Sequence, residues 1–148
     1  MPTRRAILAA APPLLAVALL RPAGATQATM QAAIQNFLGE AGPVREGRVR
    51  IDIPPLVENG NTVPLTVTVE SPMTEDDHVR RSAVFNELNP LPDVIVAHLG
   101  PRSGRAFLGT RIRLATSQTL TALAVMSDGS VWSDSASVVV TLAACVEG

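Results

Sequence analysis

The sequence contains one cysteine, no lysine, no tyrosine and few aromatic residues, which make up 3% of the chain. A single cysteine, Cys145, excludes a disulfide bond within the chain. In an oxidising compartment an odd cysteine indicates pairing with another molecule or a reactive thiol. Because aromatic rings are scarce, few side chains are available to recognise a ligand by stacking. The formal net charge of −1 gives no basic footprint for nucleic acid.

The first 25 residues have the features of a cleaved export signal. Arg4 and Arg5 precede an apolar stretch over residues 6–20, and Ala23-Gly24-Ala25 supplies a small-x-small cleavage site. The apolar stretch is too short for the ~20 residues that span a bilayer. The paired arginines favour a twin-arginine signal, and a general secretion signal is the alternative. We therefore predict cleavage of residues 1–25, a periplasmic location and no membrane attachment afterwards.

The remaining residues, 26–148, have the size of one domain. They contain nine arginines and all thirteen acidic residues, which leaves a formal charge of −4 with neutral histidines. A partner or substrate that needs a strongly basic protein is excluded.

A short amphipathic helix is predicted over residues 27–38. Met30, Ile34 and Leu38 recur at helical spacing, and Gly39 closes the pattern. A connector follows to residue 46, so residues 26–46 form a predicted helix-and-connector segment.

Residues 47–142 are predicted to form an all-β domain. Apolar and polar residues alternate along short runs, which is typical of half-buried strands. Asp128-Gly129 between apolar runs predicts a hairpin. About seven strands with frequent turns favour an antiparallel β-sandwich. The predicted strands cover residues 48–53, 63–70, 79–88, 93–99, 104–114, 120–126 and 131–142.

Several short motifs, in this order, resemble landmarks of the SoxY family from about residue 47 to residue 145. They are Glu58-Asn59-Gly60, Val63-Pro64, Ser71-Pro72-Met73-Thr74, Asn89-Pro90-Leu91-Pro92, Gly104-Arg105-Ala106, Thr110–Ala115 and Met126–Trp132. SoxY is the sulfur-carrier subunit of the periplasmic thiosulfate-oxidising Sox system.

The resemblance implies an immunoglobulin-like sandwich with a flexible C-terminal arm over residues 143–148. It further implies a heterodimer with SoxZ, a similar small sandwich, and visits to Sox-type oxidising and hydrolysing enzymes. Cys145 would be the covalent attachment point for sulfur. The protein would be a carrier acted on by enzymes, with no catalytic residue, no cofactor and no metal of its own. A disulfide-linked homodimer is a further expected form.

The predicted arm departs from the family pattern of a cysteine flanked by paired glycines. Its residues are Ala143, Ala144, Cys145, Val146, Glu147 and Gly148. Alanine restricts the backbone freedom that glycine gives, and valine adds β-branched bulk beside the sulfur. A carboxylate near the sulfur disfavours the thiolate. Nothing in the local sequence activates the thiol, so we expect partner enzymes to do so.

The sequence gives only weak indications of metal binding or catalysis. His78 and His98 could ligate a metal, but no companion ligand motif accompanies them. The acidic residues 75–77 are interpreted as a solvated turn, and Arg111 and Arg113 as an outer sheet face. No residue set resembles a nucleophile–histidine–acid unit. The alternatives to a sulfur carrier are therefore a noncatalytic periplasmic scaffold or chaperone-like partner with an incidental cysteine and, more distantly, a metal-binding module.

Overall fold

The computed structural model describes residues 26–142. They begin with helix α1 (Gln27–Leu38), which has the bounds predicted from the sequence. Thr26 caps the helix, because its hydroxyl accepts a hydrogen bond from the Thr29 N–H at 3.3 Å, and the Thr29 hydroxyl in turn accepts one from the Thr26 N–H at 2.6 Å. No helix within residues 26–142 is long and apolar enough to cross a membrane.

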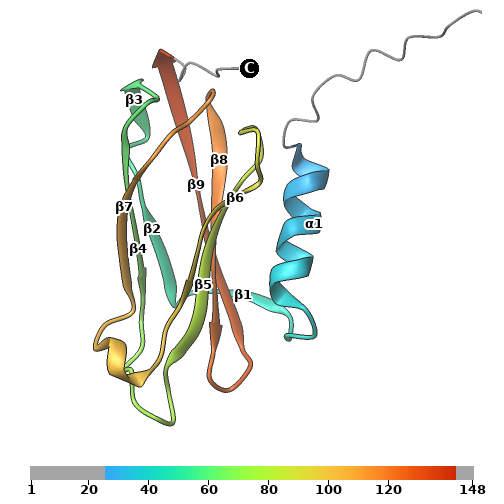
Figure 1. The fold of residues 1–148 in the computed structure, drawn as a ribbon, viewed down its shortest axis with the longest axis vertical. Helices are drawn as coiled ribbons and strands as arrows, with labels where there is room; N and C mark the ends of the chain where they lie inside the picture. The colour runs from blue at the N-terminus through green and yellow to red at the C-terminus, as the bar shows by residue number, and fades with distance from the viewer. Residues whose placement is uncertain (1–25, 143–148) are drawn as a thin grey trace, which may run out of the picture.

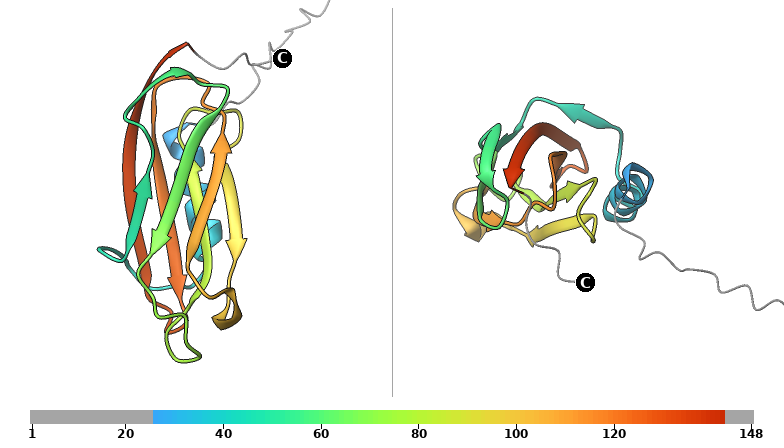
Figure 2. Two further views of the ribbon diagram at one scale, coloured as in Figure 1. Left: turned by 90° about the vertical axis from the view of Figure 1, so that its left-hand side faces the viewer. Right: turned by 90° about the horizontal axis from the view of Figure 1, so that it is seen from above.

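Two sheets face each other as a β-sandwich (Figures 1 and 2). The smaller sheet has the order β2-β4-β7, with strands β2 (Val49–Asp52), β4 (Val63–Val69) and β7 (Phe107–Ile112). The larger sheet has the order β1-β9-β8-β5-β6, with β3 also paired to β9. Its strands are β1 (Val44–Glu46), β3 (Leu56–Asn59), β5 (Val79–Asn86), β6 (Asp93–His98), β8 (Gln118–Met126) and β9 (Val131–Leu142). The predicted immunoglobulin-like sandwich is confirmed.

Strands β5 and β8 are buried on both faces of the larger sheet. Along β8, Leu120 and Ala124 pack in the core between the sheets, whereas Leu123 and Val125 face the other way. This explains why the central strands carry near-continuous apolar runs in place of strict alternation.

Helix α1 covers the outward-facing side of the larger sheet (Figure 1). Its buried residues Met30, Ile34 and Leu38 pack in one cluster with Phe85 and Leu123. The domain therefore has three layers, and the helix is part of its packed core.

The structure has two strands that the sequence did not predict, β1 and β3. Both are short and largely exposed, and both pair parallel with β9, β1 near its beginning and β3 near its end. They form because a distant strand supplies their partners, so local periodicity gave no signal for them. The fold is otherwise antiparallel.

The predicted Asp128-Gly129 hairpin joins β8 to β9. Gly129 has φ 84°, a conformation that glycine adopts without steric cost. The Met126 N–H donates to the Ser130 carbonyl at 2.9 Å and closes the turn.

Candidate functional site

The predicted attachment residue Cys145 lies outside the described residues. So do its neighbours in the predicted arm, Ala143, Ala144, Val146, Glu147 and Gly148, and the predicted signal over residues 1–25. The structure describes strand β9, whose last residue, Leu142, directly precedes the predicted arm in the sequence. The candidate site therefore consists of the end of β9 and of the residues that hold it.

The last four residues of β9 pair with β3 in parallel. Val139 lies opposite Leu56, and Leu142 lies opposite Asn59. The Val139 N–H donates to the Pro55 carbonyl at 2.9 Å, and the Gly60 N–H donates to the Leu142 carbonyl at 2.9 Å. Strand β9 is thus bonded up to its final residue, three residues before Cys145.

A side chain continues the ladder on the opposite edge of β9. Strand β8 ends its pairing at Gln118, which lies opposite Val138. Beyond that point the Ser117 hydroxyl accepts a hydrogen bond from the Val140 N–H at 2.8 Å. Thr141 adds a bond from its hydroxyl to the Glu58 carbonyl at 3.2 Å. Both edges of the terminal strand are therefore held where the arm begins.

Two amides fix the loops beside this end of the sandwich. The Asn89 Oδ1 accepts hydrogen bonds from the Ala115 N–H at 2.9 Å and from Gln118 Nε2 at 2.8 Å. The Gln118 Oε1 accepts from the Leu88 N–H at 3.0 Å. Gln118 is buried, so these bonds satisfy a polar group that would otherwise be costly to bury. The network ties the loop after β5 to the start of β8, next to Ser117.

Three large apolar side chains are exposed near the end of β9. Leu142 is 68% exposed, Leu56 61% and Val139 54%. Leu56 and Val139 lie opposite each other in the ladder, so this end of the sandwich exposes an adjacent apolar pair.

A cavity of about 390 Å³ opens between the edges of β6 and β7. The loop residues Asn89, Pro90 and Leu91 line it on one side, and Arg111 and Arg113 line it on the other. Both arginines are exposed while Ile112 between them is buried, as the alternation predicted.

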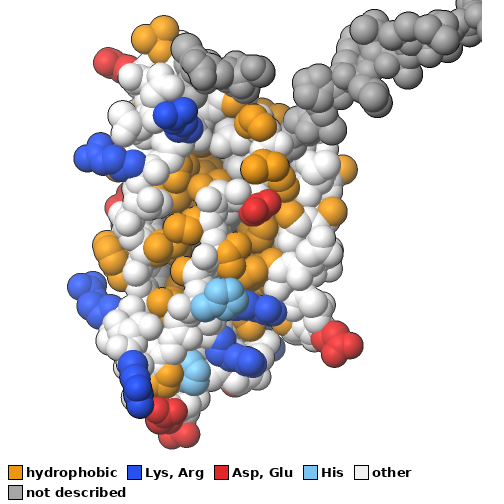
Figure 3. Space-filling model, viewed as in Figure 1, with side chains coloured by type: hydrophobic (Ala, Val, Ile, Leu, Met, Phe, Trp, Pro, Cys, Tyr) orange, Lys and Arg blue, Asp and Glu red, His pale blue; other side chains and the backbone are white. Residues whose placement is uncertain are grey.

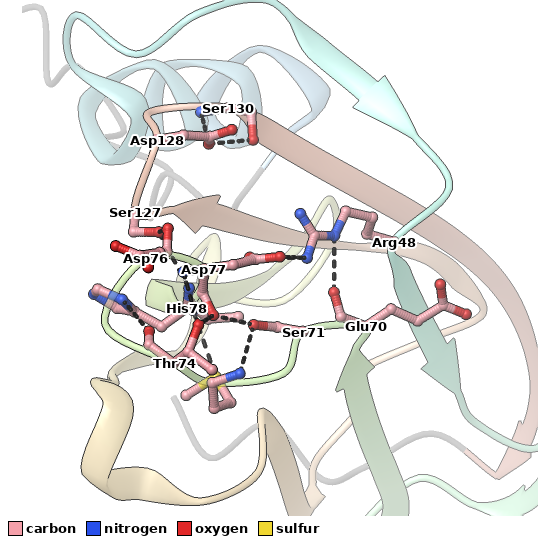
Figure 4. A network of polar contacts seen from close by, with 12 residues as sticks. Arg48, Glu70, Ser71, Thr74, Asp76, Asp77, His78, Ser127, Asp128 and Ser130 are labelled. Carbon is pink, nitrogen blue, oxygen red and sulfur yellow. Dashed lines mark hydrogen bonds and ion pairs between the residues drawn. The ribbon is translucent and has the colours of Figure 1, made fainter.

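The acidic turn after β4 is a hydrogen-bonded structure (Figure 4). Arg48 Nη2 donates to both carboxylate oxygens of Asp77 at 3.0 Å, and Arg48 Nε donates to the Glu70 carbonyl at 2.8 Å. His78 Nδ1 lies 2.9 Å from the Thr74 carbonyl oxygen. This turn therefore connects the two sheets. The sequence pattern, which predicted a solvated turn at residues 75–77, did not indicate this structural role.

In the neighbouring hairpin, hydrogen bonds donated by the Ser130 side chain and backbone hold the pKa of Asp128 below its ordinary value. This is the β8–β9 turn that the sequence predicted from Asp128-Gly129.

His78 and His98, twenty residues apart in sequence, line one pocket together with Arg80 and Arg81. Within residues 26–142 there is no group of three or more histidine, cysteine or acidic side chains that could hold a metal ion. The two histidines are therefore brought together without the further ligands that the metal-site alternative requires.

Trp132 is partly buried and packs against the inter-sheet core. Its indole N–H donates to the Ser130 hydroxyl at 3.0 Å, and the Arg45 guanidinium lies 5.9 Å from its ring centroid.

Comparison with known proteins places the chain in a family. The family model "Sulfur oxidation protein SoxY" matches residues 34–145, which is most of the chain and reaches Cys145. The chain belongs to the SoxY family.

One solved structure similar to this member of the SoxY family is the sulfur carrier protein SoxY from Chlorobium limicola f thiosulfatophilum. It is 25% identical, with a TM-score of 0.65, over 78% of this chain and 98% of the other. No curated protein matches the chain.

The SoxY fold is shared more widely. A superoxide reductase (neelaredoxin) variant from Ignicoccus hospitalis has a TM-score of 0.58 at 14% identity, over 66% of this chain and 94% of the other. The superoxide reductase from Nanoarchaeum equitans has a TM-score of 0.52 at 12% identity, over 61% and 90%. At these identities the likeness concerns the fold alone.

Sequence reasoning missed the residues that anchor β9. Strand β3 and Ser117 act through pairing with residues more than twenty positions away. The one signal in the sequence is the unbroken apolar and β-branched run at the end of β9, which predicts a strand that continues to Leu142 and so needs partners there.

Proposed function

We propose that this protein is a periplasmic sulfur carrier that holds sulfur intermediates covalently on Cys145 during thiosulfate or sulfur oxidation. The observation that carries the proposal is the SoxY family match, which extends to the chain's single cysteine. The similarity to a solved sulfur carrier protein supports it.

The anchored end of β9 suits this role. Three residues beyond Leu142 reach at most about 10 Å, at ~3.3–3.6 Å per residue. A sulfur atom at that reach can enter a narrow active-site channel while the sandwich stays outside. The hydrogen bonds on both edges of the terminal strand would keep the domain folded as the arm is drawn into an enzyme.

The chemistry assigns the redox step to a partner. Joining the Cys145 thiolate to the outer sulfur of thiosulfate forms one S–S bond and releases two electrons, which an oxidising enzyme must accept. Only a few per cent of an ordinary thiol is ionised at neutral pH. A hydrolysing enzyme can then release the terminal sulfonate as sulfate, so the carrier itself needs no catalytic residue.

A small sandwich partner of the SoxZ kind fits the exposed edges. Strands β6 and β7 stand at the ends of their sheets in the described chain. Val96 on β6 and Phe107 on β7 are 46% and 50% exposed. Unpaired edges with apolar side chains are covered in natural proteins, and pairing with a second sandwich would do this.

The test is the intact mass of the protein after incubation with thiosulfate and the oxidising enzyme. We expect a mass gain of a thiosulfonate group that a reductant removes. The Cys145→Ser variant should show no gain while its circular dichroism and partner pairing stay unchanged.

An unmodified mass in the wild-type protein would instead support a scaffold or chaperone-like role with an incidental cysteine. Loss of folding in Cys145→Ser would make the cysteine structural and refute the carrier. Fractionation of cells that express the full chain tests the periplasmic location, with a lysine pair in place of Arg4 and Arg5 as the transport-deficient control.

A further inference from the structure

Both histidines of the chain line a single pocket on the outer side of the larger sheet. The pocket has a volume of about 380 Å³ and lies where β5 begins and β6 ends. It is lined by His78, Arg80, Arg81, His98, Leu99 and Val125. Figure 3 shows the pale-blue imidazoles close to blue guanidinium groups on one face of the molecule.

The sheet places two nitrogen-bearing side chains opposite each other here. Arg81 pairs directly with His98 across the β5–β6 ladder. Side chains opposite each other in an antiparallel pair lie roughly 5 Å apart. A guanidinium and an imidazole therefore meet on one face of the sheet.

Arg81 is held in place by helix α1. Its Nη2 donates to the Leu38 carbonyl at 3.2 Å, and its guanidinium lies 5.0 Å from the centroid of the Phe37 ring. A guanidinium has five N–H donors, so most remain for another acceptor. The helix thus orients the group before any ligand arrives.

No carboxylate neutralises the pocket. None of the six lining residues is acidic. The acidic residue next to His78 is Asp77, whose two oxygens both bond Arg48. Within the described part of the chain, Arg48–Asp77 is the one ion pair at 4.0 Å or less. Arg80 and Arg81 therefore bring uncompensated positive charge to a protein that is negative as a whole.

This lining suits an anion and opposes a metal cation. Two imidazoles could contribute metal ligands, but two guanidinium groups in the same pocket repel a cation. Guanidinium groups form strong, charge-assisted hydrogen bonds with the oxygens of sulfate-like anions. The imidazole of His98 can donate an N–H as well, whereas the Nδ1 of His78 lies against the Thr74 carbonyl. We propose that this pocket binds a small divalent tetrahedral oxoanion of the sulfate class.

The anion comes from solution, because the protein's own arm is too far away. Val125 in the pocket wall lies opposite Val131, the first residue of β9, whereas the arm starts at the last residue, Leu142. At ~3.3 Å per residue β9 separates these points by roughly 35 Å. The reach of about 10 Å from Leu142 to Cys145 does not close that distance.

The test uses inorganic sulfate and the Cys145→Ser protein, so that covalent attachment to sulfur plays no part. The imidazole ¹H–¹⁵N signals of the two histidines are followed during a sulfate titration at constant ionic strength, with chloride as the exchanged ion. His98→Gln assigns the two signals. We expect both imidazoles to shift together and to saturate.

Matched arginine variants locate the site. Arg80→Gln should weaken sulfate binding by about three- to tenfold, the loss of one partly exposed charge-assisted bond. Arg81→Gln should weaken it at least as much. Arg111→Gln, an exposed arginine on β7 outside this pocket, should leave the affinity unchanged.

Arg81 also contacts α1, so a loss seen only in Arg81→Gln would reflect the helix and would overturn the proposal. Shifts that rise without saturating, or equal losses in Arg80→Gln and Arg111→Gln, would overturn it as well. None of these results depends on whether Cys145 carries sulfur.

Discussion

The hydrogen bond from the Val140 N–H to the Ser117 hydroxyl holds one edge of β9 near its end, and Ser117→Ala tests how much this bond contributes. At 2.8 Å it is the bond that holds this edge of β9 after its pairing with β8 has ended. Removing the hydroxyl leaves the pairing with β3 on the other edge intact. We therefore expect a local change at the end of β9, with the global stability nearly unchanged.

The magnitude follows from the exposure of the bond. A typical intramolecular hydrogen bond contributes about 0.5–1.5 kcal/mol net, and this one is exposed, which favours the lower half of that range. A loss of about 0.5–1 kcal/mol in local opening free energy corresponds to about two- to fivefold faster amide exchange at 25 °C. Hydrogen exchange of the Val140 amide, measured by NMR under native conditions, reports this quantity.

Ser137→Ala is the matched control. Ser137 lies on the same strand, but its hydroxyl bonds the Thr119 hydroxyl at 3.1 Å and no backbone amide of β9. Exchange at Val140 should be unchanged in this variant. Equal acceleration in both variants, or none in Ser117→Ala, would show that β3 alone holds the end of β9. The Ser117–Val140 hydrogen bond would then make no measurable contribution to stability.

The outcome bears on the proposed reach of Cys145. If both edges of β9 opened back to Val138, seven residues would separate the last bonded position from Cys145, and the reach would grow from about 10 Å to about 25 Å. The Ser117 hydroxyl and the pairing with β3 together set the last bonded position of β9.

Two further predictions concern stability. Leu123 is 1% exposed and lies between the larger sheet and α1. Leu123→Ala should lower the free energy of unfolding by about 2–5 kcal/mol in a denaturant titration. A loss below about 1 kcal/mol would mean that α1 is not a packed layer. The lowered pKa of Asp128 means that its contribution to stability is present above the unfolded-state pKa and is lost as the pH falls through the lower folded-state pKa. Thermal melts between pH 7 and pH 2 should therefore converge for wild type and Asp128→Asn at the acidic end, and a constant difference across that range would exclude the carboxylate as the cause.

Much of the fold could be predicted from the sequence because local patterns encode it. The helix over residues 27–38 and strand β9 over residues 131–142 have the predicted bounds. Strand β7 is shorter than predicted, because Pro101–Ser103 forms a 3₁₀ turn and pairing with β4 begins only at Phe107. The ends of strands are set by their partners, which periodicity does not reveal.

The candidate site was less predictable for the same reason. Cys145 could be singled out because it is the one cysteine in the sequence. The anchoring of β9 by β3 and Ser117, and the meeting of His78 with His98 in one pocket, depend on which strands become neighbours. The spacing of the two histidines carried no information about Arg80 and Arg81 until β5 and β6 were seen to pair.

The parallel pairing of β3 with the end of β9 has a mechanical consequence. Under the proposed function, an enzyme would draw on the residues that follow Leu142. A force along the axis of β9 would then load the bonds on both of its edges together in shear. Peeling a strand away breaks such bonds one after another at low force, whereas shearing requires several to rupture at once. A strand held in this way resists repeated pulling at its end without loss of the sandwich.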